Sequence, residues 1–350
     1  MSDTIRPDGS PWLSGSAPAP VPFGQPIRQP YPLAVRDHGL GTAISLMMQS
    51  LPYALARFAV LLAATIGCIV WLVVTFGGAA WLGTHVAQAF GWVWLVLCVV
   101  GAGWLWGTVL RYALHLIACG HVAVLTELIT RGTVGNGTES MFAYGRRIVT
   151  ARFGQVTALF GLNALVRGIL QSFHRTLDWL DEMLPIPGLD AIASLLTAVL
   201  GAATRYLDKV VFSYTLARNE PDAWRGAREG IVYYCQNAKP ILKTSVWIVV
   251  VEHVLSLLMF LVLLIPAAGI TVLLPHAVRE TGGLITVVIA VLLAGTLRAA
   301  FVKPLFLIVM MVRFHALIEQ QALNAEWDSR LAGISDKFRD LGRGMGAKLA

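Results

Sequence analysis

The sequence predicts an all-α, polytopic integral membrane protein: a helical bundle of about six spans, with amphipathic helices at the membrane interface. Composition supports most of this prediction. Of the 350 residues, 56% are apolar or aromatic and 13% are charged, about half the charged fraction of a soluble domain. The mean hydropathy is +0.67. A water-soluble globule cannot bury this much apolar surface, so the composition excludes a soluble enzyme, a disordered chain and a secreted disulfide scaffold.

The first 49 residues are expected to form a disordered, proline-rich cytoplasmic tail (1–49). Eight of the sixteen prolines lie between Pro7 and Pro32, a composition that favours an extended, polyproline-like chain. The tail acts either as a solvated tether or as a docking segment for a protein partner. No long apolar run precedes residue 54, so the first span itself is expected to direct insertion.

The first span is expected at 54–76, and a short link without Lys or Arg leads to a second span that begins near residue 90. The second span is apolar through Leu110, and its helical pattern continues to Thr130. One helix of that length would measure about 60 Å at 1.5 Å per residue, about twice the hydrocarbon thickness. We therefore expect either a long helix that extends into the cytoplasm or a break near Arg111.

Residues 141–245 are amphipathic and charged, and we expect this stretch to be partly interfacial. Two imperfect spans are predicted in its first part, at 153–170 and 191–217, and each is interrupted by polar or charged residues. Interfacial or re-entrant helices are the alternative.

Residues 219–245 have the pattern of an amphipathic helix. Asn219, followed three residues later by Asp222, gives an N-cap signal close to a capping box. Its apolar residues recur at helical spacing: Trp224, Ala227, Ile231, Tyr234 and Cys235. Such a helix is expected to lie in the plane of the membrane interface, and Pro240 is expected to bend the chain into the next span.

The last two spans are expected at 246–274, which contains Pro266, and at 284–312. The transmembrane helical domain therefore covers 50–313. Residues 314–350 form an amphipathic cytoplasmic tail, a second candidate docking site for a protein partner. Its apolar residues step by three and four: Trp327, Leu331, Ile334, Phe338 and Leu341.

The distribution of Lys and Arg orients the chain. The segments expected outside, 77–88, 171–190 and 276–283, hold only Arg175 and Arg279. Both termini are then cytoplasmic by the positive-inside rule, which requires an even number of spans. The net charge of +7 fits cytoplasmic loops that face anionic lipid, and no basic-aromatic stretch indicates a nucleic-acid partner. The chain is rich in alanine, glycine and arginine, as proteins of GC-rich bacteria are. We therefore expect it in a bacterial cytoplasmic (inner) membrane.

The candidate site consists of ionisable residues inside apolar runs. Glu252 and His253 lie in the fifth expected span, and Arg298 and Lys303 lie in the sixth. A charge there costs about 2.5–3.5 kcal/mol, so it usually faces a partner or a water-filled cavity. Because neighbouring spans pack antiparallel, we expect Glu252 to approach Arg298 or Lys303. The pair is either a structural ion pair that fixes helix register or part of a substrate or ion pathway.

Glu127 is the fifth candidate pathway residue, and it lies near His115, Cys119 and His121 in the sequence. His115 and Cys119 share a helix face, whereas His121 points elsewhere, which is poor spacing for a metal site. We therefore expect these to be packing residues and no metal to be bound.

Two further groups have an ordinary and a functional interpretation. One group shares one side of a helix: His174, Asp178, Asp181 and Glu182. It is either a divalent-cation site or, as we expect, a solvated acidic face. The other group flanks the second span: Trp92, Trp94, Trp104 and Trp106. Interfacial aromatic belts are arranged in this way, and an aromatic box for a quaternary ammonium group is the alternative.

No catalytic residue and no cofactor is expected. The sequence has no G-x-S-x-G, H-E-x-x-H, Walker A or dinucleotide-binding fingerprint. The four cysteines lie in apolar or amphipathic helical stretches without CxxC spacing, as small buried thiols do.

Residues 206–254 give a span end, an amphipathic helix and then the next span, in the stretch YLDKVVFSYTLARNEPDAWRGAREGIVYYCQNAKPILKTSVWIVVVEHV. In this order of features the chain resembles the C-terminal half of the choline transporter-like family, over roughly a third of its length. In that family a similar segment leads into a pair of C-terminal helices, and the last span here likewise runs into a polar tail, FHALIEQQ. The resemblance implies membrane transport and assigns no substrate residue.

Two functions from different classes remain. The first is a transporter-like carrier of a small solute or lipid headgroup, supported by the intramembrane charges and the proline-interrupted last two spans. The second is a non-enzymatic membrane scaffold or assembly factor that recruits partners through its cytoplasmic tails. A homo-oligomer is compatible with both. A polar cavity that reaches Glu252 or Arg298 would favour the carrier, and a packed centre with tails that retain a partner would favour the scaffold.

Overall fold

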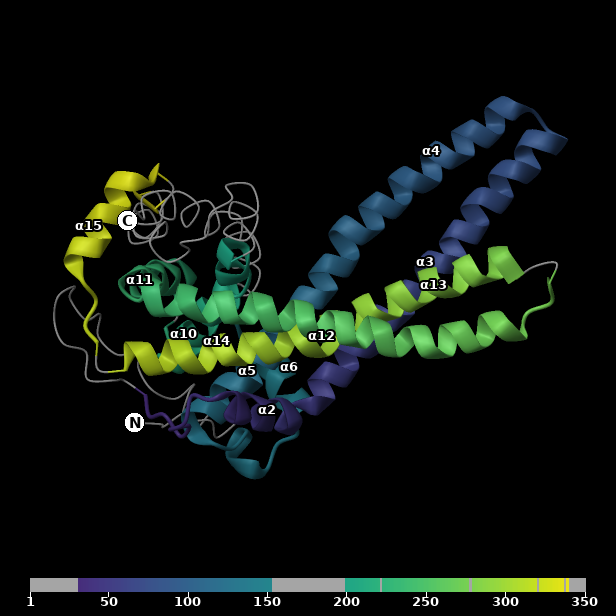
Figure 1. Cartoon of the computed structure of the whole chain (residues 1–350). Coiled ribbons are helices and arrows are strands. Elements are labelled where there is room, and N and C mark those ends of the chain that lie inside the picture. Colours follow the sequence, from purple (N-terminus) through teal and green to yellow (C-terminus); the bar gives the residue numbers. More distant parts are fainter. Residues whose placement is uncertain are drawn as a thin grey trace, which may run out of the picture. The chain divides into compact units, whose positions relative to one another are not determined.

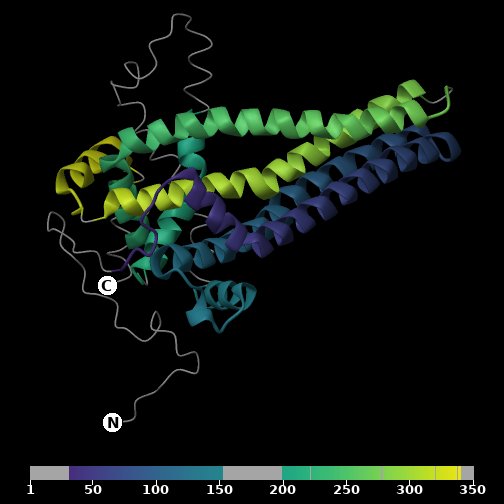
Figure 2. The same ribbon diagram turned by 60° about the horizontal axis from the view of Figure 1, so that its bottom comes forward.

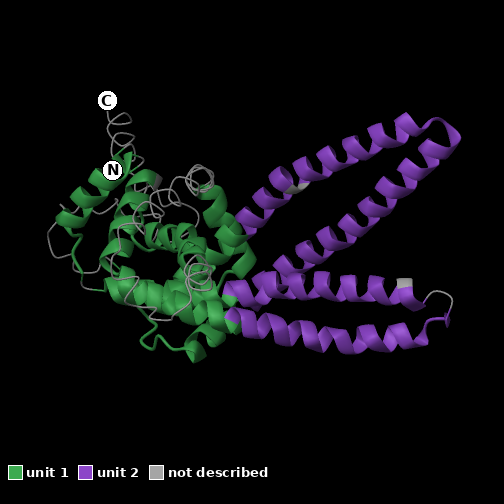
Figure 3. Ribbon diagram, turned by 45° about the horizontal axis from the view of Figure 1, so that its top comes forward, with its two compact units in different colours: residues 1–50, 118–251, 305–350 green, residues 51–117, 252–304 purple. Residues whose placement is uncertain are grey.

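The computed structural model describes residues 31–152, 199–220, 222–276, 279–319, 321–336 and 338–339. Within these ranges the chain is helical and contains no strand, which confirms the all-α prediction (Figure 1). The chain divides into two compact units, coloured separately in Figure 3. Unit 1 contains residues 1–50, 118–251 and 305–350, and unit 2 contains residues 51–117 and 252–304.

The first part of unit 2 is an antiparallel helical hairpin. Helix α3 (Leu51–His85) and helix α4 (Gln88–Trp104) lie side by side, as Figures 1 and 2 both show. A π-helix, η1 (Leu105–Leu110), and then α5 (Arg111–Arg131) continue α4 as one long helix. Of the two alternatives left open near Arg111, the long helix is therefore correct. The helix widens by a π-turn before Arg111 and does not break there.

The second part of unit 2 is built in the same way. Helix α12 (Ala238–Leu273) enters the unit at Glu252 and is followed by α13 (Arg279–Leu297). A second π-helix, η4 (Arg298–Val302), leads into α14 (Lys303–Ile318). The π-turn ends just before Pro304, which has no N–H to donate and whose ring crowds the preceding turn, so a widened turn suits this position.

Within unit 2, the two hairpins contact each other through α3. The hydroxyls of Thr65 and Thr296 lie 3.1 Å apart. The rings of Phe58 and Phe301 pack with their centroids 5.7 Å apart. These contacts place the start of α3 at the level of η4.

Four described helices are long and apolar enough to cross a membrane: Leu51–His85, Gln88–Arg131, Ala238–Leu273 and Gly282–Ile318. In each, no more than 28% of the most apolar stretch is buried within the chain. Apolar surface this extensive and this exposed is stable in hydrocarbon, where a helix also satisfies its own backbone hydrogen bonds. The protein is therefore an integral membrane protein by the length and composition of these helices.

The two interrupted spans predicted at 153–170 and 191–217 are not among these four helices. The first, at 153–170, and the start of the second lie outside the described residues. The described end of the second contains a turn at Tyr206 and then the short helix α10 (Leu207–Ala217). Ten of its eleven residues are buried inside unit 1. A helix of this length is too short to span a bilayer, and its apolar side chains are covered by protein.

Unit 1 surrounds its apolar side chains with protein. Besides α10 it contains α2 (Leu40–Gln49), α6 (Met141–Ala151), α11 (Ala223–Gln236) and α15 (Ala325–Ile334). It also contains parts of α5, α12 and α14. Its largest fully buried side chains include Tyr234, Phe212, Phe306, Phe314 and Phe338. Unit 1 thus has the hydrophobic interior that unit 2 lacks.

Helix α2 corrects the predicted end of the N-terminal tail. The tail was expected to be disordered to residue 49, but α2 begins at Leu40. Ala43, Leu46 and Met47 form its buried face, so eight residues beyond the last proline of the tail the chain is already amphipathic and packed. Residues 1–30 lie outside the described residues.

Helix α11 corrects the prediction of an interfacial helix at 219–245. Its apolar stripe packs inside unit 1, where Ala227, Ile231 and Tyr234 are buried. The N-cap is Asp222, whose side chain accepts a hydrogen bond from the backbone of Trp224. An apolar stripe shows only that something covers it, and here protein does so instead of lipid.

The chain turns at Asn237, three residues before the predicted bend at Pro240. Pro240 lies in the first turn of α12, where the missing N–H has no intrahelical partner to lose. The proline therefore starts the span and does not bend it.

The C-terminal segment also departs from the prediction of a tail at 314–350. Residue 314 lies inside α14, and both Phe314 and His315 are buried. Farther on, Leu331 and Phe338 are fully covered by the chain. Two residues of the stripe expected to dock a partner are thus already covered by the chain, whereas Ile334 is exposed and Leu341 lies outside the described residues.

Candidate functional site

Glu252 and Arg298 form an ion pair inside unit 2, as the sequence predicts. Nη2 and Nε of Arg298 both donate to Oε1 of Glu252, at 2.9 and 3.1 Å. The Glu252 side chain is 2% exposed and that of Arg298 is 32% exposed. Arg298 is the first residue of η4. The carboxylate is therefore buried, whereas the arginine that contacts it is partly exposed.

The other two candidate residues of unit 2 lie beside this pair in the sequence. His253 is exposed, and Lys303 is partly buried at the start of α14. Arg298 and Lys303 thus lie at the two ends of the π-turn, where functional sites are frequent, whereas Glu252 and His253 lie on the regular α-helix α12.

Glu127 belongs to unit 1 and lies on α5. Tyr144 of α6 donates its hydroxyl to Glu127 Oε2 at 3.0 Å, and Arg131 Nη1 lies 3.6 Å from Oε1. Burial, followed by the charge of Glu127, raises the pKa of Tyr144, so this phenol stays protonated and donates.

Glu127 also lines a small cavity. The cavity has a volume of about 20 Å³ and is shared with Thr126, Tyr144 and Arg152. This volume is enough for about one water molecule. The cavity that reaches Glu127 is therefore far too small for a solute.

His121 lies six residues before Glu127 on α5. His121 is buried, and its Nε2 lies 2.9 Å from Ser50 Oγ. No group of three or more His, Cys, Asp or Glu residues in the described parts of the chain is arranged to hold a metal ion. The cluster at 174–182 lies outside those parts.

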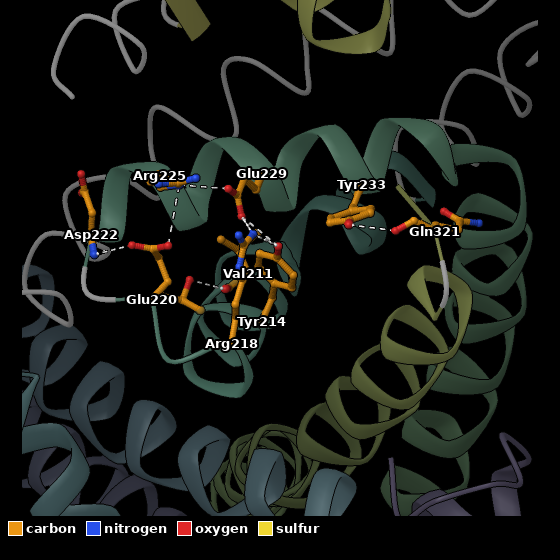
Figure 4. Close-up of polar contacts among 10 residues, drawn as sticks. Val211, Tyr214, Arg218, Glu220, Asp222, Arg225, Glu229, Tyr233 and Gln321 are labelled. Atoms are coloured by element: carbon orange, nitrogen blue, oxygen red, sulfur yellow. Dashed lines mark hydrogen bonds and ion pairs between the residues drawn. The ribbon is translucent and has the colours of Figure 1, made fainter. Parts of the chain in front are cut away.

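A dense polar cluster joins α10 to α11, and the sequence did not predict it (Figure 4). Glu229 accepts hydrogen bonds from the Tyr214 hydroxyl at 2.9 Å and from Arg225 Nε at 3.1 Å. Arg218 also donates to Glu229 and to the Tyr214 oxygen. Side chains of Arg218 and Glu229 are 2% and 3% exposed. The pair is thus removed from solvent and lipid alike.

A tight turn creates this cluster. Asn219 has a φ of 57° and occupies the residue after the cap of α10. The backbone N–H of Asn219 donates to Leu216, and that of Glu220 donates to Thr215, both at 2.9 Å. This is the Schellman pattern of a helix end, and asparagine tolerates its left-handed residue. Three residues after Asn219, α11 begins at its cap.

Two glycines allow α11 to lie close against α10. A Cβ at Gly230 would lie 2.8 Å from Cγ2 of Val211, and one at Gly226 would overlap Thr215. The close approach places Glu229 beside Arg218. Burial opposes the charge of Arg218, but Tyr214 and Glu229 outweigh burial and raise the pKa of Arg218.

A buried chain of hydroxyls and imidazole links three helices of unit 1. Thr126 Oγ1 lies 2.8 Å from Ser213 Oγ, which lies 2.8 Å from Nε2 of His315. Nδ1 of His315 lies 3.2 Å from the Tyr31 hydroxyl. Ser213 and His315 are fully buried, so no substrate reaches them in this arrangement, and the contacts join α5, α10 and α14.

Comparison of the chain with models of protein families, with curated proteins and with solved structures finds no match. The resemblance to the choline transporter-like family therefore stays a prediction.

Proposed function

We propose that the protein is a transporter-like carrier of a small solute or lipid headgroup in a bacterial cytoplasmic membrane. The supporting observation is the Glu252–Arg298 ion pair, which lies within apolar helices at a π-turn. Ionisable residues at such positions are costly and are usually functional. The layout shared with the choline transporter-like family agrees with this role, and no catalytic residue is required for it.

The ion pair provides two complementary binding groups. When it opens, the Glu252 carboxylate attracts a cationic group and the Arg298 guanidinium attracts an anionic one. A zwitterionic solute or lipid headgroup would exchange partners with both residues. Arg298 is the first residue of the π-turn η4, and π-turns are frequent at functional sites. The site would therefore alternate between the internal pair and a bound headgroup.

The charge distribution supports an orientation with both termini in the cytoplasm. Only five of the 27 Lys and Arg residues lie in 51–117 and 252–304. By the positive-inside rule, the more basic remainder belongs on the cytoplasmic side. An even number of spans follows, and the four apolar helices of the described residues agree with it.

Reconstitution of the full chain into liposomes tests the proposal. Headgroup-labelled phosphatidylcholine and radiolabelled choline serve as lipid and solute probes. Glu252→Gln and Arg298→Gln are each expected to lower the protein-dependent rate about tenfold, which corresponds to about 1.4 kcal/mol in barrier height. The double variant is expected to be no slower than either single variant, because the two residues act as a unit.

Glu326→Gln is the matched control, because Glu326 forms an exposed ion pair with Arg330 at 2.6 Å. It is expected to leave the rates unchanged. Circular dichroism and gel filtration establish that each variant folds. Rates equal to those of empty liposomes for both probes, or fully additive losses in the double variant, would contradict the proposal.

A second candidate function is a membrane scaffold, favoured by the fixed position of α15. Arg228 forms an ion pair with Asp328 at 2.6 Å, and its guanidinium lies 5.2 Å from the Phe338 ring centroid. The outer face of this segment displays Glu326, Arg330 and Asp336. Such a face would recruit a protein partner by charge. Charge reversal at Glu326 and Arg330 would then prevent the protein from retaining this partner in a pull-down, and it would leave the transport rate unchanged.

A further inference from the structure

Unit 2 contains an apolar groove between α3 and the continuous helix α4–η1–α5. Its volume is about 450 Å³, within the range of about 300–1,000 Å³ that ligand pockets occupy. Except for Trp71, its lining residues are small or aliphatic: Ala64, Gly67, Cys68, Ala102, Leu105, Val109, Leu110 and Ala113. From Ala102 to Ala113 the wall is about 16 Å long at 1.5 Å per residue. The groove is thus narrow and long.

Helix packing explains where the groove begins. Toward the hairpin tip the helices are in close contact: Trp71 Nε1 donates to the carbonyl of Cys98 at 3.2 Å. Nearer the tip, a Cβ at Gly91 would lie 2.7 Å from the carbonyl oxygen of Ala79. On the other side of Trp71, small residues such as Ala64 and Gly67 leave space that no side chain fills. Trp71 therefore closes one end of the groove.

The surroundings of the groove select a hydrocarbon ligand. Ile66 and Val70 on α3, and Leu105 and Val109 on the opposite wall, are exposed apolar residues. This surface belongs to helices suited to a bilayer, so the groove opens toward lipid acyl chains. Its lining residues offer an apolar ligand extensive contact.

The charges near the open end select an anionic headgroup. Arg57 lies seven residues before Ala64 and fourteen before Trp71, a spacing that places it on the same face of α3 as the groove lining. Arg111 is exposed, between Leu110 and Ala113 of the opposite wall. Residues 51–117 contain these two arginines and no Asp or Glu. An arginine pair of this kind suits a phosphate.

We propose that this groove is a binding site for an anionic phospholipid. One acyl chain lies along the groove with its end toward Trp71, and the phosphate lies at Arg57 and Arg111. The lining of the groove includes neither Glu252 nor Arg298, so the binding site does not depend on the proposed function.

Native mass spectrometry of the full-length protein in detergent tests this site, with phosphatidylglycerol and phosphatidylcholine of equal chain length as probes. The protein is expected to retain one phosphatidylglycerol in preference to phosphatidylcholine. Gly67→Leu places a side chain in the groove, where a Cβ meets no atom within 4 Å. It is expected to weaken phosphatidylglycerol binding about tenfold. Gly77→Leu is the matched control, because Gly77 is equally open on the same helix but does not line the groove.

The arginines separate headgroup recognition from chain binding. Arg57→Gln and Arg111→Gln are each expected to weaken phosphatidylglycerol about fivefold, from about 1 kcal/mol per basic residue, and to weaken phosphatidylcholine less, because its ammonium group balances the phosphate charge. Should Gly67→Leu fail to fold, Ala102→Leu fills the groove from the opposite wall. Equal loss of lipid in Gly67→Leu and Gly77→Leu would overturn the site. The site would also be overturned if Gly67→Leu converted a dimer to a monomer and left lipid binding intact. That result would show that a second copy of the chain occupies the groove of the unsubstituted protein.

Discussion

The two units of this protein use apolar side chains in opposite ways. In unit 2, Ile265 is 73% exposed and Leu273 is 86% exposed, although both lie in long apolar helices. In unit 1, Ile231 and Phe212 are almost completely buried by other parts of the chain. The same residue types therefore face lipid in one unit and protein in the other, and hydropathy alone does not separate these cases.

The ion pairs of the two units also differ in how far protein encloses them. Arg218 and Glu229 are both enclosed by unit 1, whereas Arg298 of the unit 2 pair keeps about a third of its surface exposed. An enclosed pair has no alternative partner when it opens. We therefore expect the unit 1 pair to control stability and the unit 2 pair to control function.

The largest expected effect is that of Glu229→Gln. The substitution removes the carboxylate that Arg218 and Arg225 contact, and it leaves the buried Arg218 guanidinium without the carboxylate to which it donates. The free energy of unfolding is expected to fall by about 3–5 kcal/mol. Thermal unfolding of the purified protein in detergent measures the loss.

Glu252→Gln sharpens the comparison in the same assay. Because Arg298 is partly exposed, its side chain can reorient, and a smaller loss of stability is expected than for Glu229→Gln. Equal losses would show that both pairs are structural, and the distinction between the units would then fail for charges.

The next effect concerns two isoleucines on helices of similar pattern. Ile231→Ala removes a fully buried side chain from α11 and is expected to cost about 2–5 kcal/mol. Ile265→Ala removes an exposed side chain from α12 and is expected to change stability by less than about 0.5 kcal/mol. The difference between their unfolding midpoints measures the contrast. A large loss for Ile265→Ala would mean that another protein surface, such as a second copy, covers this helix.

The Glu252–Arg298 contact was predictable from the sequence because its prediction needs few assumptions. Two long apolar runs were adjacent in the chain, and each carried a costly charge. Antiparallel packing was then sufficient to bring the charges together. The four long spans were predictable for the same reason, since length and hydropathy are local properties.

The Arg218–Glu229 contact was not predictable in this way. It depends on Asn219 adopting a left-handed conformation and on Asp222 acting as the cap. Both residues are good caps, so the sequence did not determine which one starts α11. The stripe on α11 was correctly periodic, but periodicity does not identify the surface that covers it.

The smallest expected effects differ in sign between the units. Gly230→Ala would place a Cβ 2.8 Å from Val211 of α10. Val211 is buried and β-branched, so it has little freedom to move, and a loss of about 1–3 kcal/mol is expected. Gly269→Ala on α12 meets no atom within 4 Å. Alanine there restricts the unfolded chain and favours the helix, so a gain of about 0.4–1 kcal/mol is expected.

A double variant establishes the cause of the Gly230→Ala loss. Combined with Val211→Ala, the new methyl group at residue 230 occupies space that the valine methyl groups have left. The two losses are therefore expected to be less than additive by about 0.5–3 kcal/mol in thermal unfolding. Strict additivity would locate the strain elsewhere. A loss for Gly269→Ala equal to that of Gly230→Ala would show that α12 is as tightly packed there as α11, and the proposed lipid-facing character of that helix would be wrong.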